Sequence, residues 1–565
     1  VGATIGTVVA VHKVEAEIVG NSSITATGAL GSTDRAIGAS SSRTISGVDV
    51  VAQSGIFGAA LTVAGGASGS VGLAGAVANT TIIEETTARI TGGTVNTDRN
   101  VTVLADSDVT MESLGGGVGG GGAVGAGLGA AASVHDDTTT AAIDGTATIN
   151  AKGNTGSTLM PTGEELGTGE HTLSAVRGVA VSAVSEELII SGAIGVGAGG
   201  TTGLAGSGAV SVQTEVTKAW IGGNVTITDT NANSTQDLYV LARDTGTVVS
   251  GGGSFAGSGT GGGAAGAGVQ VTVKETRAWI AGDVTTKDDI AVRALSEDEA
   301  VVVAISGSGG AFGSLAGAAS VLSIDNTTEA AVKGTANLTA GDSIAINALD
   351  NTSTDVIAGA ASGAIASGAG SGGVSVINKT TQTLIEAGAT LTANGGGSGV
   401  KSLTGGVGVE YLAEAGGNDV SVGTSGASSS TASAQGFDNQ GFDSERVASA
   451  DATNLGGITV QAVSTDRVET FSVNGSGGGA AVALGGTVNV INNITESKVG
   501  AGVRLTTIAA GDDIRVAASS DSYALNVMAA VAVGGLAGAP GASAAVFDSR
   551  TEARVTGAVL RSAGD

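Results

Sequence analysis

Histidine and cysteine, which often carry nucleophilic or metal chemistry, are scarce in this sequence. There are three histidines, His12, His135 and His171, and no cysteine. A zinc site usually needs cysteine or clustered histidine, and these scattered positions indicate no Ser-His-Asp arrangement. His12 and His135 end the similar segments VGATIGTVVAVH and VGAGLGAAASVH, so we interpret them as equivalent positions of a repeat. The sequence therefore predicts no catalytic residue, no cofactor and no metal ligand at histidine.

Carboxylates are numerous and several are adjacent. We interpret the pairs Glu84–Glu85 and Glu164–Glu165 as solvated charges, not as the acid pair of a glycosidase. Acidic corners occur at Asp136–Asp137, Asp288–Asp289 and Asp512–Asp513. Turn chemistry favours aspartate at such corners. Calcium bound by these carboxylates and backbone carbonyls is the alternative, although the glycine-aspartate nonapeptide of calcium-binding β-rolls is absent.

Charge and composition exclude several classes of function. The 565 residues include 24 basic and 51 acidic residues, a net charge of -27. Nucleic acid is not an expected partner, because Lys and Arg must neutralise its phosphates. Aromatic residues make up only 2% of the chain, which argues against the sugar-stacking platform of a carbohydrate enzyme. The longest uncharged glycine-rich run, 114–134, is nearly half glycine, so we predict no membrane span.

Two markers repeat along the chain and move together. The first is T-x-A-x-[IV]-x-G. With looser copies it recurs at Val14, Thr86, Thr139, Thr217, Thr276, Thr328, Thr381, Thr495 and Thr551. The second is a short alternating strand that ends in alanine, such as VTVLA at Val101 or IAINA at Ile344. A unit of about 53 residues is therefore repeated, with insertions where the spacing lengthens, at about 154–178 and 395–455.

Short strands broken by Gly, Asn and Asp predict an all-β fold without helical segments. Because stacked units can share one core, we expect one continuous, elongated parallel β-helix, or β-solenoid, over 1–565. We expect two or three coils per unit and a rod of about 130 Å. Both ends fall inside the repeat pattern, so we interpret the chain as a fragment of a longer array.

Aromatic residues mark the candidate contact positions. Trp220 and Trp279 occupy the same variable position of the first marker, in TKAWIGG and TRAWIAG, and strand alternation predicts that both point outward. We expect them about 10 to 15 Å apart along one face. They form either a contact strip, shielded by Lys218 and Arg277, or a cover over neighbouring glycines.

The larger insertion concentrates aromatic residues that the repeats avoid. Tyr411, Phe437 and Phe442 lie there, the last two in a duplicated G-F-D. We expect this segment to project from the solenoid as a loop or small subdomain. It is either a second contact site or a surface loop without a partner.

The T-x-A-x-I-x-G units, the corners such as INNIT and the linkers such as ANLTAGDSIAINA resemble the large adhesins of Gram-negative bacteria, namely filamentous haemagglutinin and the leukotoxin-type filamentous adhesins. The resemblance implies a right-handed parallel β-helix, export with an outer-membrane partner, and display on the bacterial cell surface. We therefore expect a non-enzymatic adhesive fibre whose partners are neighbouring fibre copies, other cells or surface glycans. The alternatives are a subunit of a laterally associating filament or sheath, and a β-helical carbohydrate-active enzyme.

Overall fold

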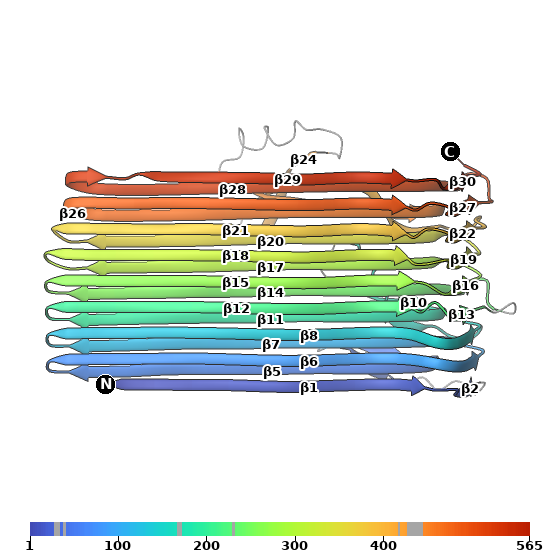
Figure 1. The fold of residues 1–565 in the computed structure, drawn as a ribbon, viewed down its shortest axis with the longest axis horizontal. Helices are drawn as coiled ribbons and strands as arrows, with labels where there is room; N and C mark the ends of the chain where they lie inside the picture. Colours follow the sequence, from blue (N-terminus) through green and yellow to red (C-terminus); the bar gives the residue numbers. More distant parts are fainter. Residues whose placement is uncertain are drawn as a thin grey trace.

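A computed structural model describes residues 1–26, 34–37, 41–166, 172–228, 232–415, 418–425 and 444–564. The described part of the chain is all-β and contains no helix. Its main feature is one stack of parallel strands, with 23 strands in a single hydrogen-bonded system (Figure 1). The predicted β-solenoid fold is confirmed.

Each turn of the solenoid contains two long strands and one short strand. The first long strand is β5 (Gly47–Ser68), β7 (Asn100–Gly121), β11 (Gly178–Gly199), β14 (Asp237–Ser258), β17 (Ile290–Gly309), β20 (Ile344–Gly363), the first part of β26 (Gly457–Val499) and β28 (Asp513–Gly538). The second is β1 (Gly2–Val19), β6 (Val71–Thr97), β8 (Val124–Ala151), β12 (Thr202–Ile221), β15 (Gly261–Ile280), β18 (Gly313–Val332), β21 (Ala366–Ile385), the last part of β26 and β29 (Gly541–Val555). The short strand is β2 (Ser23–Ala26), β13 (Thr226–Ile227), β16 (Asp283–Thr285), β19 (Asn337–Ala340), β22 (Thr390–Ala393), β27 (Arg504–Thr507) and β30 (Val559–Arg561), and the ends of β6 and β8 take its place in their turns.

One repeat makes one turn, so the prediction of two or three coils per repeat is wrong, and so is the rod length that followed from it. Leu238 of β14 pairs with Ile290 of β17, one repeat further along, and Gly261 of β15 pairs with Gly313 of β18. A strand extends by about 3.3 Å per residue, whereas each turn adds only about 4.8 Å to the height of the stack. The long strands are therefore longer than the stack is high. Glycines that look like strand breaks lie inside long strands, because pairing with both neighbouring turns keeps them extended.

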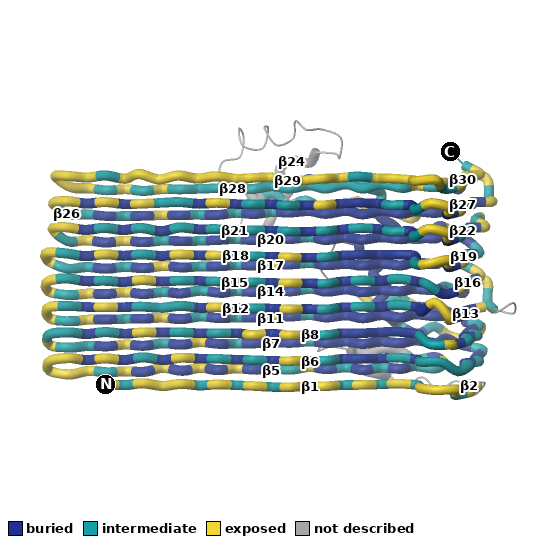
Figure 2. Tube along the Cα trace, in the orientation of Figure 1, coloured by how far each residue is buried: buried dark blue, intermediate teal, exposed yellow. Residues whose placement is uncertain are grey.

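Side-chain alternation produces two kinds of interior. Near the marker strands, where three walls meet, Val, Ile and Ala fill a continuous core that includes Ala219, Ile221 and Ala278. In the other half only two walls face each other, and glycine lets them approach closely. A Cβ on Gly127 would overlap the carbonyl oxygen of Val196, so no larger residue fits there. Figure 2 shows the resulting alternation of buried and exposed residues along the long strands.

Antiparallel strands occur at three places in the described residues, while the parallel stack continues past each of them. Within the predicted insertion at 154–178, β9 (Thr158–Pro161) pairs with β10 (Leu173–Val176). Within the one at 395–455, β23 (Val400–Ala415) pairs with β24 (Asn418–Ser425) and β25 (Ser444–Leu455). A third hairpin, β3 (Asp34–Ile37) with β4 (Ser41–Thr44), was not anticipated from the sequence.

The start of β23 and the end of β25, within the larger insertion, pack on the solenoid. Leu403 of β23 is buried in one cluster with Leu295, Leu349 and Val463 on the outer face of the first strands. Met160 of β9 and Val400 of β23 similarly cover outward-facing residues of that face in another cluster. The expectation of a projecting loop or small subdomain is therefore wrong for these residues, because the face beneath them is apolar and needs a cover. It stays a prediction for the rest of the insertion.

Candidate functional site

An acidic groove lies where the two larger insertions meet the start of β14 and β17. Asp237 begins β14, and Asp288 and Asp289 directly precede β17, so consecutive turns bring the three residues together. One carboxylate oxygen from each lies within 4.8 Å of the others. The Asp289 amide donates to Asp237 Oδ1 at 3.2 Å, which links the two corners.

The walls of the groove come from the insertions. The cavity has a volume of about 590 Å³ and is lined on one side by Glu164 and Ser174, and on the other by Lys401 and Asn454. Ser174 donates to Glu164 Oε2 at 2.8 Å, and the Tyr239 hydroxyl donates to Glu164 Oε1 at 3.2 Å. The groove is therefore predominantly acidic, and hydrogen bonds hold one of its walls.

Arg293 of β17 fastens both insertions to the solenoid. Its side chain is fully buried; it donates to the Thr162 carbonyl at 2.6 Å and to the Lys401 carbonyl at 2.7 Å. The guanidinium lies 5.6 Å from the centre of the Tyr239 ring. A single cation thus fixes the positions of two segments that are far apart in the sequence.

The carboxylates of the groove are poorly compensated. Burial, with the nearby charges of Asp288 and Asp289 added, raises the pKa of Asp237 to about 8. Burial and the charges of Asp288 and Asp342 raise the pKa of Asp289 to about 7. Three clustered carboxylates with raised pKa values favour a bound cation or a cationic ligand group, and their oxygen ligands suit Ca²⁺.

The other acidic residues singled out from the sequence occupy different environments. Asp137 is buried and Asp136 is exposed, while Asp512 and Asp513 lie in a later turn. Glu84 is also buried, where it accepts a hydrogen bond from Thr86 at 3.2 Å. The interpretation of Glu84–Glu85 as two solvated charges is wrong, because adjacent strand residues face opposite sides.

Glu164–Glu165 likewise differs from the interpretation as solvated charges. Glu164 lines the groove and Glu165 forms a buried ion pair with Arg243. The local sequence could not show this, because β14, far along the chain, supplies the arginine.

The two tryptophans stack directly on each other. Trp220 pairs with Trp279 in register, the ring centroids are 4.9 Å apart and the rings are parallel within 1°. The expectation of a wider separation is wrong, because it assumed several coils per repeat whereas one repeat forms one turn. Each ring is half-buried.

Cations from other turns flank this stack. Arg89 lies 5.8 Å from the Trp220 centroid and Lys333 lies 4.3 Å from the Trp279 centroid. Lys218 and Arg277, which were expected to shield the rings, both pair with Glu275 instead. The contact-strip hypothesis for Trp220 and Trp279 stays a prediction.

Several predicted positions lie outside what the structure describes. Tyr411 is in β23, but its side chain is not among the described ones, and Phe437, Phe442 and His171 fall outside the described residues. His12 and His135 are not equivalent: His12 pairs in register with Glu84, whereas His135 pairs with Ile82. The segment alignment that suggested equivalence is shifted by two residues.

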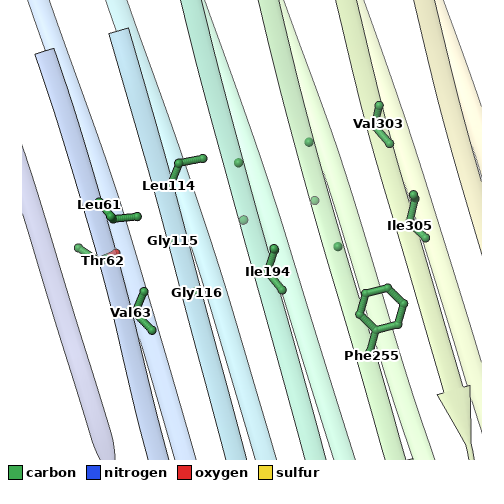
Figure 3. A pocket seen from close by; sticks show the side chains of 15 residues that line it. Leu61, Thr62, Val63, Leu114, Gly115, Gly116, Ile194, Phe255, Val303 and Ile305 are labelled. Carbon is green, nitrogen blue, oxygen red and sulfur yellow. The ribbon is translucent and has the colours of Figure 1, made fainter. Parts of the chain in front are cut away.

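The glycine-rich half has an apolar groove on its outer face. Leu61, Ile194, Phe255 and Ile305 surround a floor of glycines in a hollow of about 500 Å³ (Figure 3). Phe255 is 50% exposed and Leu61 is 73% exposed. A second apolar hollow, which includes Leu315 and Leu484, lies on the opposite wall.

Comparison of the chain with protein-family models, with curated proteins and with solved structures finds no match. The class defined by the fold is the β-solenoid repeat protein, and the adhesin resemblance stays a prediction. Within the described residues, no helix is long and apolar enough to cross a membrane.

Proposed function

We propose that this chain is part of a non-enzymatic, adhesive structural fibre on the bacterial cell surface, exported with an outer-membrane partner. The observation that carries this proposal is the acidic groove: two irregular insertions from a regular scaffold meet over it, tied together by Arg293. In repeat proteins, inserted loops commonly form the binding face.

The groove would bind cationic groups of another cell's surface, or a glycan through a calcium ion. Asp237, Asp288 and Asp289 offer clustered oxygen ligands that line this groove. The raised pKa values of Asp237 and Asp289 indicate that a positive charge placed there would be favoured.

The test is binding of purified protein to bacterial cells and to immobilised glycans. The Asp237→Asn, Asp289→Asn double variant should bind at least tenfold more weakly, and a chelator should reproduce this loss if calcium mediates contact. Asp325→Asn, a charge change of the same kind on an exposed strand position, is the control. Equal binding by both variants would contradict the role of the groove, and glycan degradation by the wild type would favour the enzyme alternative.

Lateral association into a filament is a second candidate, supported by the exposed apolar residues on both walls. Leu61 and Phe255 lie on one wall, and Leu315, 69% exposed, lies on the other. Extended apolar patches often mark association surfaces. Electron micrographs of purified wild type and of Phe255→Ser should show ordered polymers only for the wild type, whereas dispersed single particles for both would contradict this function.

A further inference from the structure

A row of polar and charged side chains, two residues before successive copies of the first marker, begins at the exposed His12 and then runs through the interior of the solenoid. Parallel register aligns these residues from turn to turn. The row is His12, Glu84, Asp137, Glu215, Lys274, Asn326, Lys379 and Asn493. Acidic residues of the first long strands face it across the interior.

The ammonium of Lys379 is well matched to its surroundings. It lies 2.7 Å from Asp350 Oδ1 and 2.8 Å from Asp466 Oδ1. The remaining oxygens also have donors: Thr328 donates to Asp350 at 2.9 Å, and Asn493 donates to Asp466 at 2.7 Å. This cluster shows how the interior accommodates buried charges when every carboxylate oxygen has a donor.

Lys274 faces a larger excess of carboxylates, and several of their oxygens lack a hydrogen bond. Its Nζ lies 2.6 Å from Glu215, 2.5 Å from Asp244, 3.0 Å from Asp298 and 3.6 Å from Glu187. One ammonium therefore faces four carboxylates, all buried. Such an excess of buried negative charge is costly unless protons or another cation neutralise it.

His135 lies beside this excess charge and has unused ring nitrogens. It is 1% exposed, and neither ring nitrogen makes a hydrogen bond of ordinary geometry. Burial and the charge of Lys274 lower the pKa of His135 to about 4, although the Ile82 backbone acts in the opposite direction. The imidazole is therefore neutral at pH 7 and can donate a lone pair.

Glu187 and Glu215 complete a set of potential ligands. Glu187 Oε2 and both carboxylate oxygens of Glu215 make no hydrogen bond of ordinary geometry, although the Lys274 ammonium is close to both residues. One ligand atom from each of His135, Glu187 and Glu215 lies within 4.8 Å of the others. Burial, with the charges of neighbouring carboxylates added, raises the pKa values of both glutamates well above the ordinary range, although Lys274 acts in the opposite direction.

We propose that His135, Glu187 and Glu215 bind one divalent transition-metal ion, of the zinc class, inside the solenoid. One imidazole nitrogen with carboxylate oxygens suits such ions, and the chain has no cysteine to compete. Two added positive charges would leave a single negative charge among the four carboxylates, the lysine and the metal. The ion would join β8, β11 and β12, which belong to two successive turns and both facing walls (Figure 1).

The site would form together with the fold, because its ligands come from three strands. The test is therefore refolding of the full chain from denaturant and chelator, with and without equimolar zinc sulfate, followed by elemental analysis and thermal unfolding. We expect about one zinc ion per chain and a higher unfolding midpoint with zinc. His135→Gln and Glu215→Gln should each lower bound zinc at least tenfold.

The control is His12→Gln, which removes a histidine from the first turn without touching the ligand set. It should leave the zinc content unchanged. If the His135 variant does not refold, cobalt binding to the wild type decides, because cobalt absorption reports nitrogen and oxygen coordination directly. Wild type that refolds without taking up zinc or cobalt, or equal zinc binding by His135→Gln, would overturn the proposal.

Discussion

Replacing Lys379 with methionine tests whether the interior charges hold the solenoid together. The substitution keeps much of the side-chain volume but leaves Asp350 and Asp466 without a cation, 2.7 and 2.8 Å from where the ammonium lay. Removing one partner of a buried ion pair typically costs about 3–5 kcal/mol. We expect a loss of that size at pH 7, concentrated in the turns that contain β20, β21 and β26.

The loss of stability in the Lys379 variant should depend on pH. Burial disfavours the charged lysine, yet Asp350 and Asp466 raise the pKa of Lys379, so in the wild type this ion pair persists throughout the neutral range. The pKa of Asp350 is already raised by burial, and loss of Lys379 would raise it further. The Asp350 carboxylate of the variant therefore takes up a proton as the pH falls, and the loss of stability should shrink between pH 7 and pH 4.

Hydrogen exchange read turn by turn is the appropriate assay, because repeat proteins open locally. The matched control is Lys218→Met, which breaks the partly exposed ion pair with Glu275 at 2.8 Å. That change should cost about 1 kcal/mol or less. A Lys379 variant no less stable than the Lys218 variant, or a loss that does not shrink in acid, would refute the reasoning.

Three further predictions concern the groove, the glycine-rich half and the tryptophans. Asp237→Asn should raise the stability at pH 9 by on the order of 1 kcal/mol but not at pH 4, because a carboxyl with a raised pKa destabilises the fold above its ordinary pKa. The shift of the thermal unfolding midpoint measures this, and equal effects at both pH values would contradict it. Gly127→Ala should lower the free energy of unfolding in urea by about 3 kcal/mol because the added Cβ would overlap backbone atoms, whereas Gly208→Ala, where the Cβ would lie in open space, should be neutral. Similar losses for both variants would be inconsistent with close packing of the two walls. The double variant Trp220→Ala, Trp279→Ala should lower the stability by about 1 kcal/mol more than the loss of buried area alone would, because the ring stacking is lost as well. Unchanged adhesion by this variant would eliminate the contact-strip hypothesis.

The candidate sites were only partly visible in the sequence. The Asp288–Asp289 corner stands out locally, but Asp237 joins it through the stacking of turns and Lys401 through packing of the larger insertion. The cluster of His135, Glu187 and Glu215, for which we propose a metal ion, was missed altogether. A signal was present, since polar residues recur two positions before the first marker, as at Glu215 and Lys274.

The sequence by itself determined the period and the inward face of each marker strand, because equivalent residues such as Ala219 and Ala278 must stack on one another in a parallel array. It did not determine how many turns one period makes. Glycines inside a long strand such as β15 resemble turns in isolation, and only hydrogen bonds to the neighbouring turns keep them extended. The tertiary structure alone decided which charges share the interior, because Glu187 and Glu215 meet across facing walls that no local pattern specifies.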